Sequence, residues 1–314
     1  MLNRALMQVN TVAIGGHVRP DGDCTGSTLG LYQYIKNCFP NIQVDVYLED
    51  IPESFKPMIP VSEEILHEVD AEKVYDLFIA LDCGDAGRLG FSAPLFENAK
   101  ATMCIDHHVS NASFADENYI IPDASSTSEL VYNLLDKEKI TTEIAECLYL
   151  GIVHDTGVFQ YSCTSPRTME IAADLMRKGI RSNEIIDKTF YEKTYAQNQI
   201  LGRALLESFL FMDGKCIVSY ITKKIMDFHG VTPKDLEGIV SQLRVTKGVE
   251  VAILLYETAP QEYKVSLRAT GDVDVSKVAG FFGGGGHKKA AGVTMKGTVH
   301  DIINNLSEQI DIQL

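Results

Sequence analysis

The sequence of 314 residues contains no apolar run of 18 or more residues, so no segment is long enough to cross a membrane as a helix. Its first residues, MLNRALMQVNTVAIGGH, lack a cleavage site and the apolar core of a signal peptide. Disordered and low-complexity segments are also missing, and 45% of the residues are hydrophobic. We therefore expect a folded cytoplasmic protein without a membrane partner, long enough for two domains.

Cysteine pairs are missing as well. The seven cysteines are odd in number, form no C-x-x-C pair and mostly lie in apolar segments. We expect them to be reduced and to act as small core residues. The sequence also has neither a Walker A motif nor a G-x-G-x-x-G motif after its first strand.

Positive charge is scarce. There are 28 Lys and Arg residues against 43 Asp and Glu residues, which gives a net charge of −15. Such a chain repels long polyanions, so we expect no tight binding of long duplex nucleic acid. The stretch from Lys264 to Lys296 is a local exception, because its basic residues outnumber its acidic ones. A small anionic ligand could be received there.

The first 160 residues alternate short apolar runs with amphipathic stretches. Strands are expected at 11–17, 44–49, 76–83 and 102–108, and helices at 24–39, 126–139, 142–157 and 165–179. This alternation predicts an α/β fold with a parallel sheet covered on both faces. Ligand sites in such folds lie beyond the carboxyl ends of the strands.

The pattern changes after residue 180. Residues 182–211 are expected to form helix, break and helix without a strand, and strands and helices alternate again from residue 214. We therefore predict three parts: a domain at 1–185, a helical linker at 186–211 and a smaller α/β domain at 212–314. The linker could let the domains open and close.

Acidic and imidazole side chains gather where the predicted strands end. Four carboxylates with imidazoles at one sheet edge favour a divalent metal site, and two ions more than one. The absence of thiolates favours Mn²⁺ or Mg²⁺ over structural zinc. On this reading His17 and Asp21 serve one ion and Asp23 the other. The candidates are His17, Asp21, Asp23, Asp82, His107, His108 and Asp155.

Each of these residues has a plain structural alternative. An Asp-Gly-Asp sequence is usually a solvated turn, and a single histidine at a strand end is usually structural. Asp106 is expected to hold the loop or a histidine rather than a metal. Asp85 and His154 are expected to support the site or the fold. The occurrence of four such clusters in one α/β unit favours a functional site over these structural alternatives.

A second motif, FFGGGGHKKAAG, occupies residues 281–292. Consecutive glycines allow backbone N–H groups to approach an anion, and His287 and its neighbouring lysines add positive charge. The alternative is a flexible hinge. Arg268 is either a bidentate partner for the same anion or a surface residue. The aromatic residues Phe159, Tyr161 and Phe282 either stack on a base or belong to the core.

These motifs together resemble the DHH phosphoesterase superfamily. The stretches HVRPDGDCTGS, ALDCGD, CIDHHVSN and GIVHDTGVFQYSCTSPRT are similar, in order, to its four motifs. The stretch VSLRATGDVDVSKVA followed by GGGGHKKAAG resembles the DHHA1 domain. The two-domain layout is similar to the bacterial and archaeal nanoRNase and pAp phosphatase group. The resemblance implies a parallel-sheet DHH domain, a smaller α/β DHHA1 domain and an active site in the cleft between them.

The resemblance also implies an activity and a set of residue roles. The activity is metal-dependent release of mononucleotides from very short RNA or DNA and removal of the 3′-phosphate from adenosine 3′,5′-bisphosphate (pAp). Asp82, His107 and His108 are implied as catalytic, with His108 at the scissile phosphate. Two Mn²⁺ ions, or Mg²⁺ or another divalent metal, are implied on His17, Asp21, Asp23, Asp82, His107 and Asp155, with Asp82 bridging. Arg268, Gly285, Gly286 and His287 are implied to hold the far end of the substrate.

Several alternatives stay open at this point. A soluble phosphodiesterase for cyclic-di-AMP or pApA shares every motif quoted above. A non-catalytic nucleotide sensor and a hydrolase of pyrophosphate or a phosphorylated sugar are further alternatives. A homodimer fits the family likeness, but no interface is visible in the residues.

Overall fold

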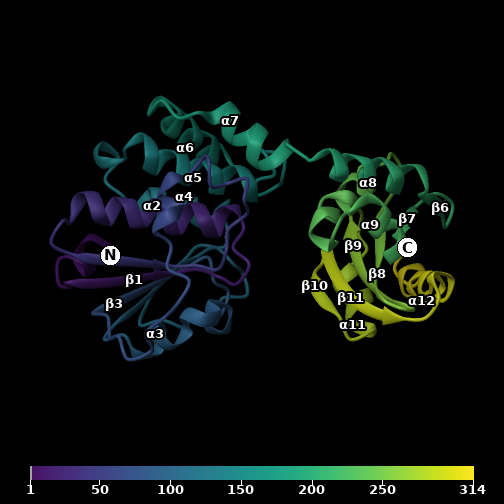
Figure 1. The fold of residues 1–314 in the computed structure, drawn as a ribbon, viewed down its shortest axis with the longest axis horizontal. Helices are drawn as coiled ribbons and strands as arrows, with labels where there is room; N and C mark the ends of the chain where they lie inside the picture. Colours follow the sequence, from purple (N-terminus) through teal and green to yellow (C-terminus); the bar gives the residue numbers. More distant parts are fainter. Residues whose placement is uncertain (1) are drawn as a thin grey trace. The chain divides into compact units, whose positions relative to one another are not determined.

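The computed structural model describes residues 2–314 and divides the chain into two compact units, one up to Glu192 and one from Lys193 to Leu314. Each unit has its own sheet and its own core (Figure 1). None of the helices in residues 2–314 is both long and apolar enough to span a bilayer.

The first unit is built on a five-stranded sheet in which all neighbouring strands are parallel. Its order is β2 (Gln43–Tyr47), β1 (Thr11–Gly15), β3 (Leu77–Leu81), β4 (Thr102–Asp106) and β5 (Glu117–Ile120). The four strands expected from the sequence are confirmed with bounds that differ by one or two residues, and β5 was not predicted. Because the strands are parallel, their carboxyl ends meet at one edge.

Helices cover both faces of this sheet (Figure 1). The larger layer contains α2 (Gly22–Cys38), α4 (Thr127–Leu134), α5 (Thr142–Asp155), α6 (Pro166–Arg177) and α7 (Ser182–Ile186), and α1 (Leu2–Leu6) joins the same core. The opposite face carries α3 (Ala93–Asn98) and the 3₁₀ turn Ala86–Ser92. Alternation along β1 explains both layers, since Val12 and Ile14 enter the larger core and Ala13 the smaller one.

Helices α2 and α5 touch through their backbones. A Cβ atom on Gly26 would lie 2.3 Å from the carbonyl oxygen of Cys147 and 2.8 Å from the amide nitrogen of Gly151. One turn earlier on α2, a Cβ on Gly22 would meet the His154 ring at 2.3 Å. The helices are therefore antiparallel, and the start of α2 lies beside the end of α5.

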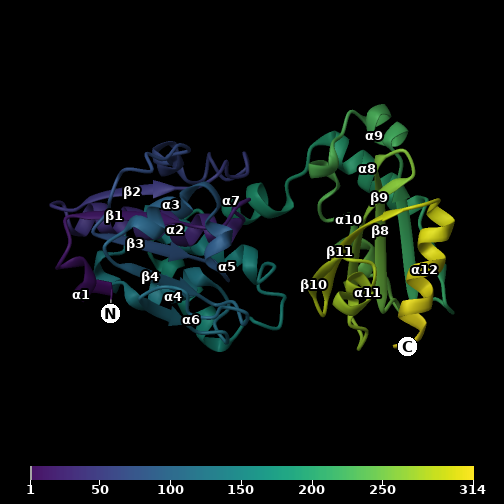
Figure 2. The same cartoon turned by 90° about the horizontal axis from the view of Figure 1, so that it is seen from below.

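The second unit contains a six-stranded mixed sheet (Figure 2). Its order is β10 (Gly285–His287), β11 (Ala290–Lys296), β9 (Glu262–Ala269), β8 (Val251–Ala259), β7 (Cys216–Ile221) and β6 (Phe209–Phe211), and only β7 and β8 are parallel. One face packs on α8 (Tyr195–Leu206), α9 (Lys223–His229) and α10 (Ile239–Arg244), and the other on α11 (Val275–Phe281) and α12 (Val299–Asp311). The expected pair of α/β units is confirmed.

The segment expected to link the domains without a strand contains one, because residues Phe209–Phe211 form β6. It starts with the end of α7 and a π-helical turn, Asp187–Tyr191. Its second half belongs to the second unit, because Ile200 and Ala204 of α8 pack in the same core as Ile217. The domain limits at residues 185 and 212 stay predictions.

Candidate metal centre

Three strand ends supply the centre of the candidate site. His17 follows β1 by two residues, and Asp82 follows β3 directly. Asp106 is the last residue of β4, and His107 and His108 come next. The parallel sheet therefore brings to one edge residues that are up to 91 positions apart in the chain (108 − 17).

Two helices supply the remaining carboxylates. Asp21 is the N-cap of α2, and its Oδ1 accepts hydrogen bonds from the backbone N–H groups of Asp23 and Cys24, both at 3.1 Å. Asp23 lies in the first turn of α2, and Asp155 is the last residue of α5. The glycine contact between these helices puts both carboxylates at the same sheet edge.

Asp82 lies at the middle of the cluster. Its Oδ2 is 3.5 Å from Nε2 of His17, and its Oδ1 is 3.6 Å from Nε2 of His107 and 3.7 Å from Nδ1 of His108. The backbone of Asp82 has a φ of 57°, a left-handed conformation that costs free energy in a residue with a side chain. Each oxygen of this carboxylate thus faces a different imidazole, as a ligand bridging two ions would.

The other predicted ligands fall on the two sides of Asp82. Asp21 Oδ1 lies 3.6 Å from His17 Nε2. Asp155 Oδ2 lies 3.2 Å from His107 Nε2, and Asp23 Oδ2 lies 4.0 Å from the same nitrogen. Two ligands at right angles, each about 2.1 Å from an ion, are about 3 Å apart, so these separations suit cation coordination with small adjustments. Asp21 is more exposed to solvent than the other ligands, since its side chain is 59% exposed.

The histidines are oriented by backbone carbonyl groups. Nδ1 of His17 is 2.9 Å from the carbonyl oxygen of Val18, and Nδ1 of His107 is 3.4 Å from that of Ala124. A hydrogen bond at Nδ1 leaves Nε2 as the acceptor in the neutral ring, which is the form that binds a metal. In both residues Nε2 is the atom that faces the carboxylates.

The N-terminus of α4 grips two of the carboxylates, a contact that the sequence analysis missed. Backbone N–H groups of Thr127 and Ser128 donate to Oδ2 and Oδ1 of Asp23 at 2.6 and 2.8 Å. The hydroxyl group of Thr127 donates to Oδ1 of Asp82 at 3.0 Å. A helix N-terminus favours a carboxylate at this position. The available signal was the stretch STSE, in which Ser126 caps α4.

Burial and mutual repulsion make Asp23 and Asp155 weak acids. Burial, together with the negative charge of Asp82, raises the pKa of Asp23 to about 7. Burial and the charges of Asp23 and Asp82 raise the pKa of Asp155 to about 9. A nearby cation removes this penalty because it stabilises the ionised forms. The donor set of oxygen and imidazole nitrogen therefore fits a hard or borderline divalent ion.

Asp106 holds a histidine, as expected. Its Oδ1 is 2.7 Å from Nδ1 of His108, and its Oδ2 accepts from the side-chain amide of Asn111 at 2.7 Å. Burial alone would raise the pKa of Asp106, but these hydrogen bonds lower it. The same hydrogen bond raises the pKa of His108. The Nε2 atom of His108 is the ring nitrogen that this contact leaves available.

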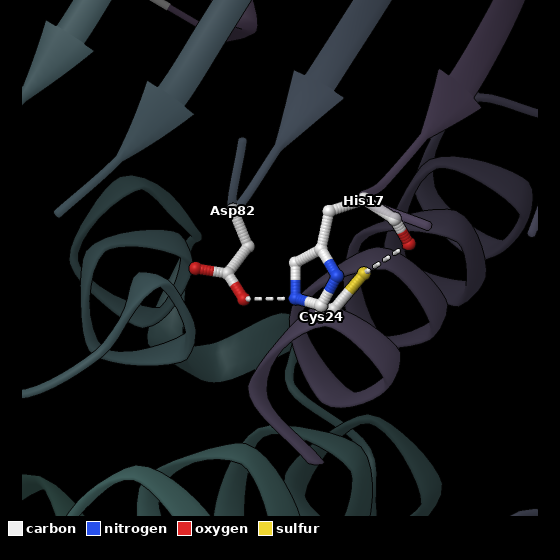
Figure 3. Close-up of side chains that lie close together, drawn as sticks. All are labelled: His17, Cys24 and Asp82. Atoms are coloured by element: carbon white, nitrogen blue, oxygen red, sulfur yellow. Dashed lines mark hydrogen bonds and ion pairs between the residues drawn. The ribbon is translucent and has the colours of Figure 1, made fainter. Parts of the chain in front are cut away.

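Cys24 is the one thiol in the cluster within the described residues (Figure 3). It is fully buried beside His17 and Asp82, and its Sγ is 3.9 Å from the carbonyl oxygen of His17. Burial and the adjacent carboxylates raise the pKa of this thiol well above its ordinary value. The sulfur therefore stays protonated and packs, as expected for a core cysteine.

His154 supports the site from the side. Its ring lies against Gly22 and meets Phe55 edge-on at a centroid distance of 4.9 Å. Its Nε2 is 2.9 Å from the hydroxyl oxygen of Thr189, in the π-helical turn. The supporting role considered for His154 agrees with these contacts.

In the second unit, strand register places Arg268 and His287 on one face. His287 pairs with Ala290, and Ala290 pairs with Arg268. Residues directly opposite in antiparallel strands point to the same side, so the two basic side chains flank a small alanine. The glycine motif is an ordered hairpin rather than a hinge: a Cβ on Gly286 would lie 2.5 Å from the carbonyl oxygen of Ala290. Gly285 is exposed, with nothing within 4 Å of its Cβ position.

Comparison with known families agrees with both units. The DHH family N-terminal domain matches residues 11–152, and the DHHA1 domain matches residues 213–311. The chain is a DHH/DHHA1 phosphoesterase. It is similar to the bifunctional oligoribonuclease and PAP phosphatase NrnA of Thermus thermophilus, with 29% identity over 91% of this chain and 84% of that protein. NrnA of Bacillus subtilis is 28% identical over 94% and 92%.

Two solved structures have a similar fold. An exopolyphosphatase-related protein from Bacteroides fragilis superposes with a TM-score of 0.89 at 26% identity, over 99% of this chain and 94% of that one. RecJ from Thermus thermophilus, solved in complex with Mn²⁺, gives a TM-score of 0.53 at 14% identity, over 99% of this chain and 53% of that one. The second likeness concerns the fold alone.

Proposed function

We propose that this DHH/DHHA1 phosphoesterase degrades very short oligonucleotides to mononucleotides and converts pAp to AMP. The observation that carries the proposal is the position of Asp82, whose two oxygens face His17 and His107 next to the buried carboxylate of Asp23. Such an arrangement suits a pair of ions at a phosphoryl group. The similarity to NrnA proteins over most of the chain supports the nucleotide substrates.

The proposed cofactor is a pair of Mn²⁺ ions, with Mg²⁺ or another divalent ion as an alternative. When bound, such ions lower the pKa of a water molecule and neutralise charge on the phosphoryl oxygens. We assign one ion to His17 and Asp21 and the other to Asp23, His107 and Asp155. Asp82 is assigned as the bridge, and Thr127 holds one of its oxygens in place.

His108 is assigned to the scissile phosphate. Asp106 fixes its Nδ1, so Nε2 is free to carry a proton and donate it to a phosphoryl oxygen. The raised pKa favours this donor form. The side chain is 34% exposed, whereas that of Asp106 is fully buried, so His108 can reach a substrate and Asp106 can only orient it.

The far end of the substrate is assigned to the second unit. Arg268 and His287 share one face of the sheet, and Ala290 between them leaves room for a phosphate group. Gly285, which is exposed, and the neighbouring Gly286 are assigned to the same end of the substrate. Because the net charge of −15 repels a long nucleic acid, the proposed substrate length is one to a few nucleotides.

The test compares several phosphoesters with the full chain. The panel is a dinucleotide, pAp, pApA, cyclic-di-AMP, pyrophosphate and a phosphorylated sugar, each assayed with Mn²⁺ and then with EDTA. We expect mononucleotide from the dinucleotide, phosphate from pAp, and loss of both with EDTA. Hydrolysis of pyrophosphate alone would refute the nucleotide assignment, cyclic-di-AMP or pApA as the preferred substrate would replace the proposal, and no turnover would leave a non-catalytic sensor.

Asp82→Ala is the matching variant. It removes the proposed bridge, so we expect turnover to fall by at least a thousand-fold, about 4 kcal/mol of transition-state stabilisation. Asp50→Ala is the control, because Asp50 is an exposed aspartate in a loop of the same unit and is not assigned to an ion. Near-normal rates for Asp82→Ala would refute the ligand assignment, and thermal unfolding shows whether the variant is folded.

A further inference from the structure

Of the three aromatic residues considered for base stacking, the structure leaves one available. Phe159 packs against Tyr149 at a centroid distance of 6.1 Å and joins the core of the first unit. Phe282 packs on the core of the second unit. Tyr161 belongs to neither core and is 47% exposed.

The chain between Asp155 and Tyr161 contains a strained turn. Gly157, Val158 and Phe159 have φ values of 55°, 57° and 63°, so three residues in a row are left-handed. This conformation is a clear outlier for a β-branched residue such as Val158. Strain of this kind persists only where the surrounding structure enforces it, and it is concentrated at functional sites.

Hydrogen bonds to Thr156 hold the turn in this conformation. Its hydroxyl oxygen accepts from the backbone N–H of Phe159 at 3.0 Å. Its carbonyl oxygen accepts from the N–H groups of Gln160 and Tyr161, both at 2.9 Å. Thr156 is fully buried and follows Asp155 directly, so the turn is anchored to the end of α5.

The result of the strain is the position of the Tyr161 ring. A Cβ atom on Gly157 would lie 2.4–2.7 Å from Cζ, Cε1 and Cε2 of Tyr161. Three atoms of one ring at such short and similar distances mean that the ring lies on the backbone of Gly157. The ring therefore lies on a residue that is only two positions after Asp155, and about half of the surface of Tyr161 is in solvent.

We propose that Tyr161 is a stacking platform for a nucleobase of the substrate and so a specificity-determining residue. This inference rests on the proposed function and narrows it: the substrate class is a phosphoester with a base next to the scissile phosphate. Every nucleobase has a π face, so such a platform accepts all four bases. Pyrophosphate has no group that can stack on it.

The test pairs variants of Tyr161 with abasic substrates. Three variants are used: Tyr161→Phe keeps the ring, Tyr161→Leu keeps apolar bulk without it, and Tyr161→Ala removes both. The substrates are a dinucleotide and its two analogues with a tetrahydrofuran abasic residue in place of one nucleoside. KM, kcat and Mn²⁺ affinity are measured for each combination.

We expect Tyr161→Ala and Tyr161→Leu to raise KM for the dinucleotide by about five- to a hundred-fold, the range for loss of one aromatic stack. The variant with Phe should keep KM close to that of the unchanged chain. One abasic analogue should bind the unchanged chain as weakly as the dinucleotide binds Tyr161→Ala, and the substitution should not weaken it further. Mn²⁺ affinity should stay the same, which separates stacking from a structural effect on Asp155.

Two results would overturn the proposal: an unchanged KM in Tyr161→Ala, or an equal loss for the dinucleotide and both abasic analogues. Phe228→Ala is the control, because Phe228 is an exposed aromatic residue of the second unit that contacts the ring of His229. Failure of the proposed function is distinct, because the unchanged chain would then hydrolyse no nucleotide.

Discussion

Gly26→Ala tests whether the backbone contact between α2 and α5 builds the site. The added Cβ would lie 2.3 Å from the carbonyl oxygen of Cys147 and 2.8 and 3.1 Å from the amide nitrogen and Cα of Gly151. All three atoms are backbone atoms of α5, so no side chain can rotate away. Carbon and carbonyl oxygen normally stay at least about 3.3 Å apart, so α5 has to move by about 1 Å.

This displacement affects both stability and activity. Overpacking of this kind costs about 1–3 kcal/mol, which lowers the melting temperature of a unit of this size by roughly 2–12 °C. The same shift moves Asp155, at the end of α5, away from His107, 3.2 Å from it at present. A misplacement of about 1 Å can reduce turnover about a hundred-fold. We expect weaker Mn²⁺ binding together with slower turnover.

The assay combines thermal unfolding, calorimetric titration with Mn²⁺ and turnover of a dinucleotide. Gly202→Ala is the matched control: Gly202 is also in a helix, but nothing lies within 4 Å of its Cβ position. That variant should gain about 0.5–1 kcal/mol of stability with unchanged turnover. If Gly26→Ala behaved like Gly202→Ala, the close crossing would not be what positions Asp155.

Two further substitutions address the support of the carboxylates and the pH dependence of stability. Thr127→Val removes the hydroxyl group that donates to Asp82 but keeps the N–H group that donates to Asp23, so Mn²⁺ affinity or turnover should fall about 10- to 100-fold. Thr127→Ser keeps the hydroxyl group and should restore the lost affinity or turnover. Equal values for the Val variant and the unchanged chain would contradict this reasoning. Asp76→Asn should lower the melting temperature at pH 7, because a hydrogen bond from Lys100 and backbone N–H groups lower the pKa of Asp76 to about 2. Because the pKa of Asp76 is lower in the folded protein, its contribution to stability is present above about pH 4 and is lost as the pH falls towards 2. The difference in melting temperature between the variant and the unchanged chain should therefore shrink on acidification. A constant difference from pH 7 to pH 3 would contradict this reasoning.

The sequence predicts the buried strands better than the exposed ones for a physical reason. Buried parallel strands are short apolar runs such as LFIAL at β3, and polar residues mark their ends, as Asp82 does. The edge strand β5, ENYI, is partly exposed and lacks this pattern. Strand β10 consists of two glycines and His287, a composition typical of a loop, and only its pairing with β11 makes it a strand.

The candidate site divides in the same way. Strand ends and a motif spacing indicate which side chains share an edge of the sheet, and the structure brings His17, Asp82 and His107 together there. Contacts made through backbone atoms leave no comparable trace. The stretch STSE indicates where α4 begins, but the hydrogen bond from the N–H group of Thr127 to Asp23, 104 residues away, depends on how α4 packs, which no local pattern contains.

The electrostatics of the cluster bear on the choice between an enzyme and a sensor. Asp23 and Asp82 are almost fully buried, and Asp155 lies beside them, so without a cation the raised pKa values of Asp23 and Asp155 favour their neutral forms, and these acids offer a phosphate group no positive charge. A protein that only binds nucleotides needs cationic or N–H groups at the phosphate and gains nothing from holding acids together there. The N–H groups at the start of α4 donate to Asp23 and not to a ligand, so the helix terminus that could bind an anion binds a carboxylate of the protein itself. That arrangement is advantageous only if the carboxylates then hold ions that meet the phosphate, and it therefore favours hydrolysis over sensing.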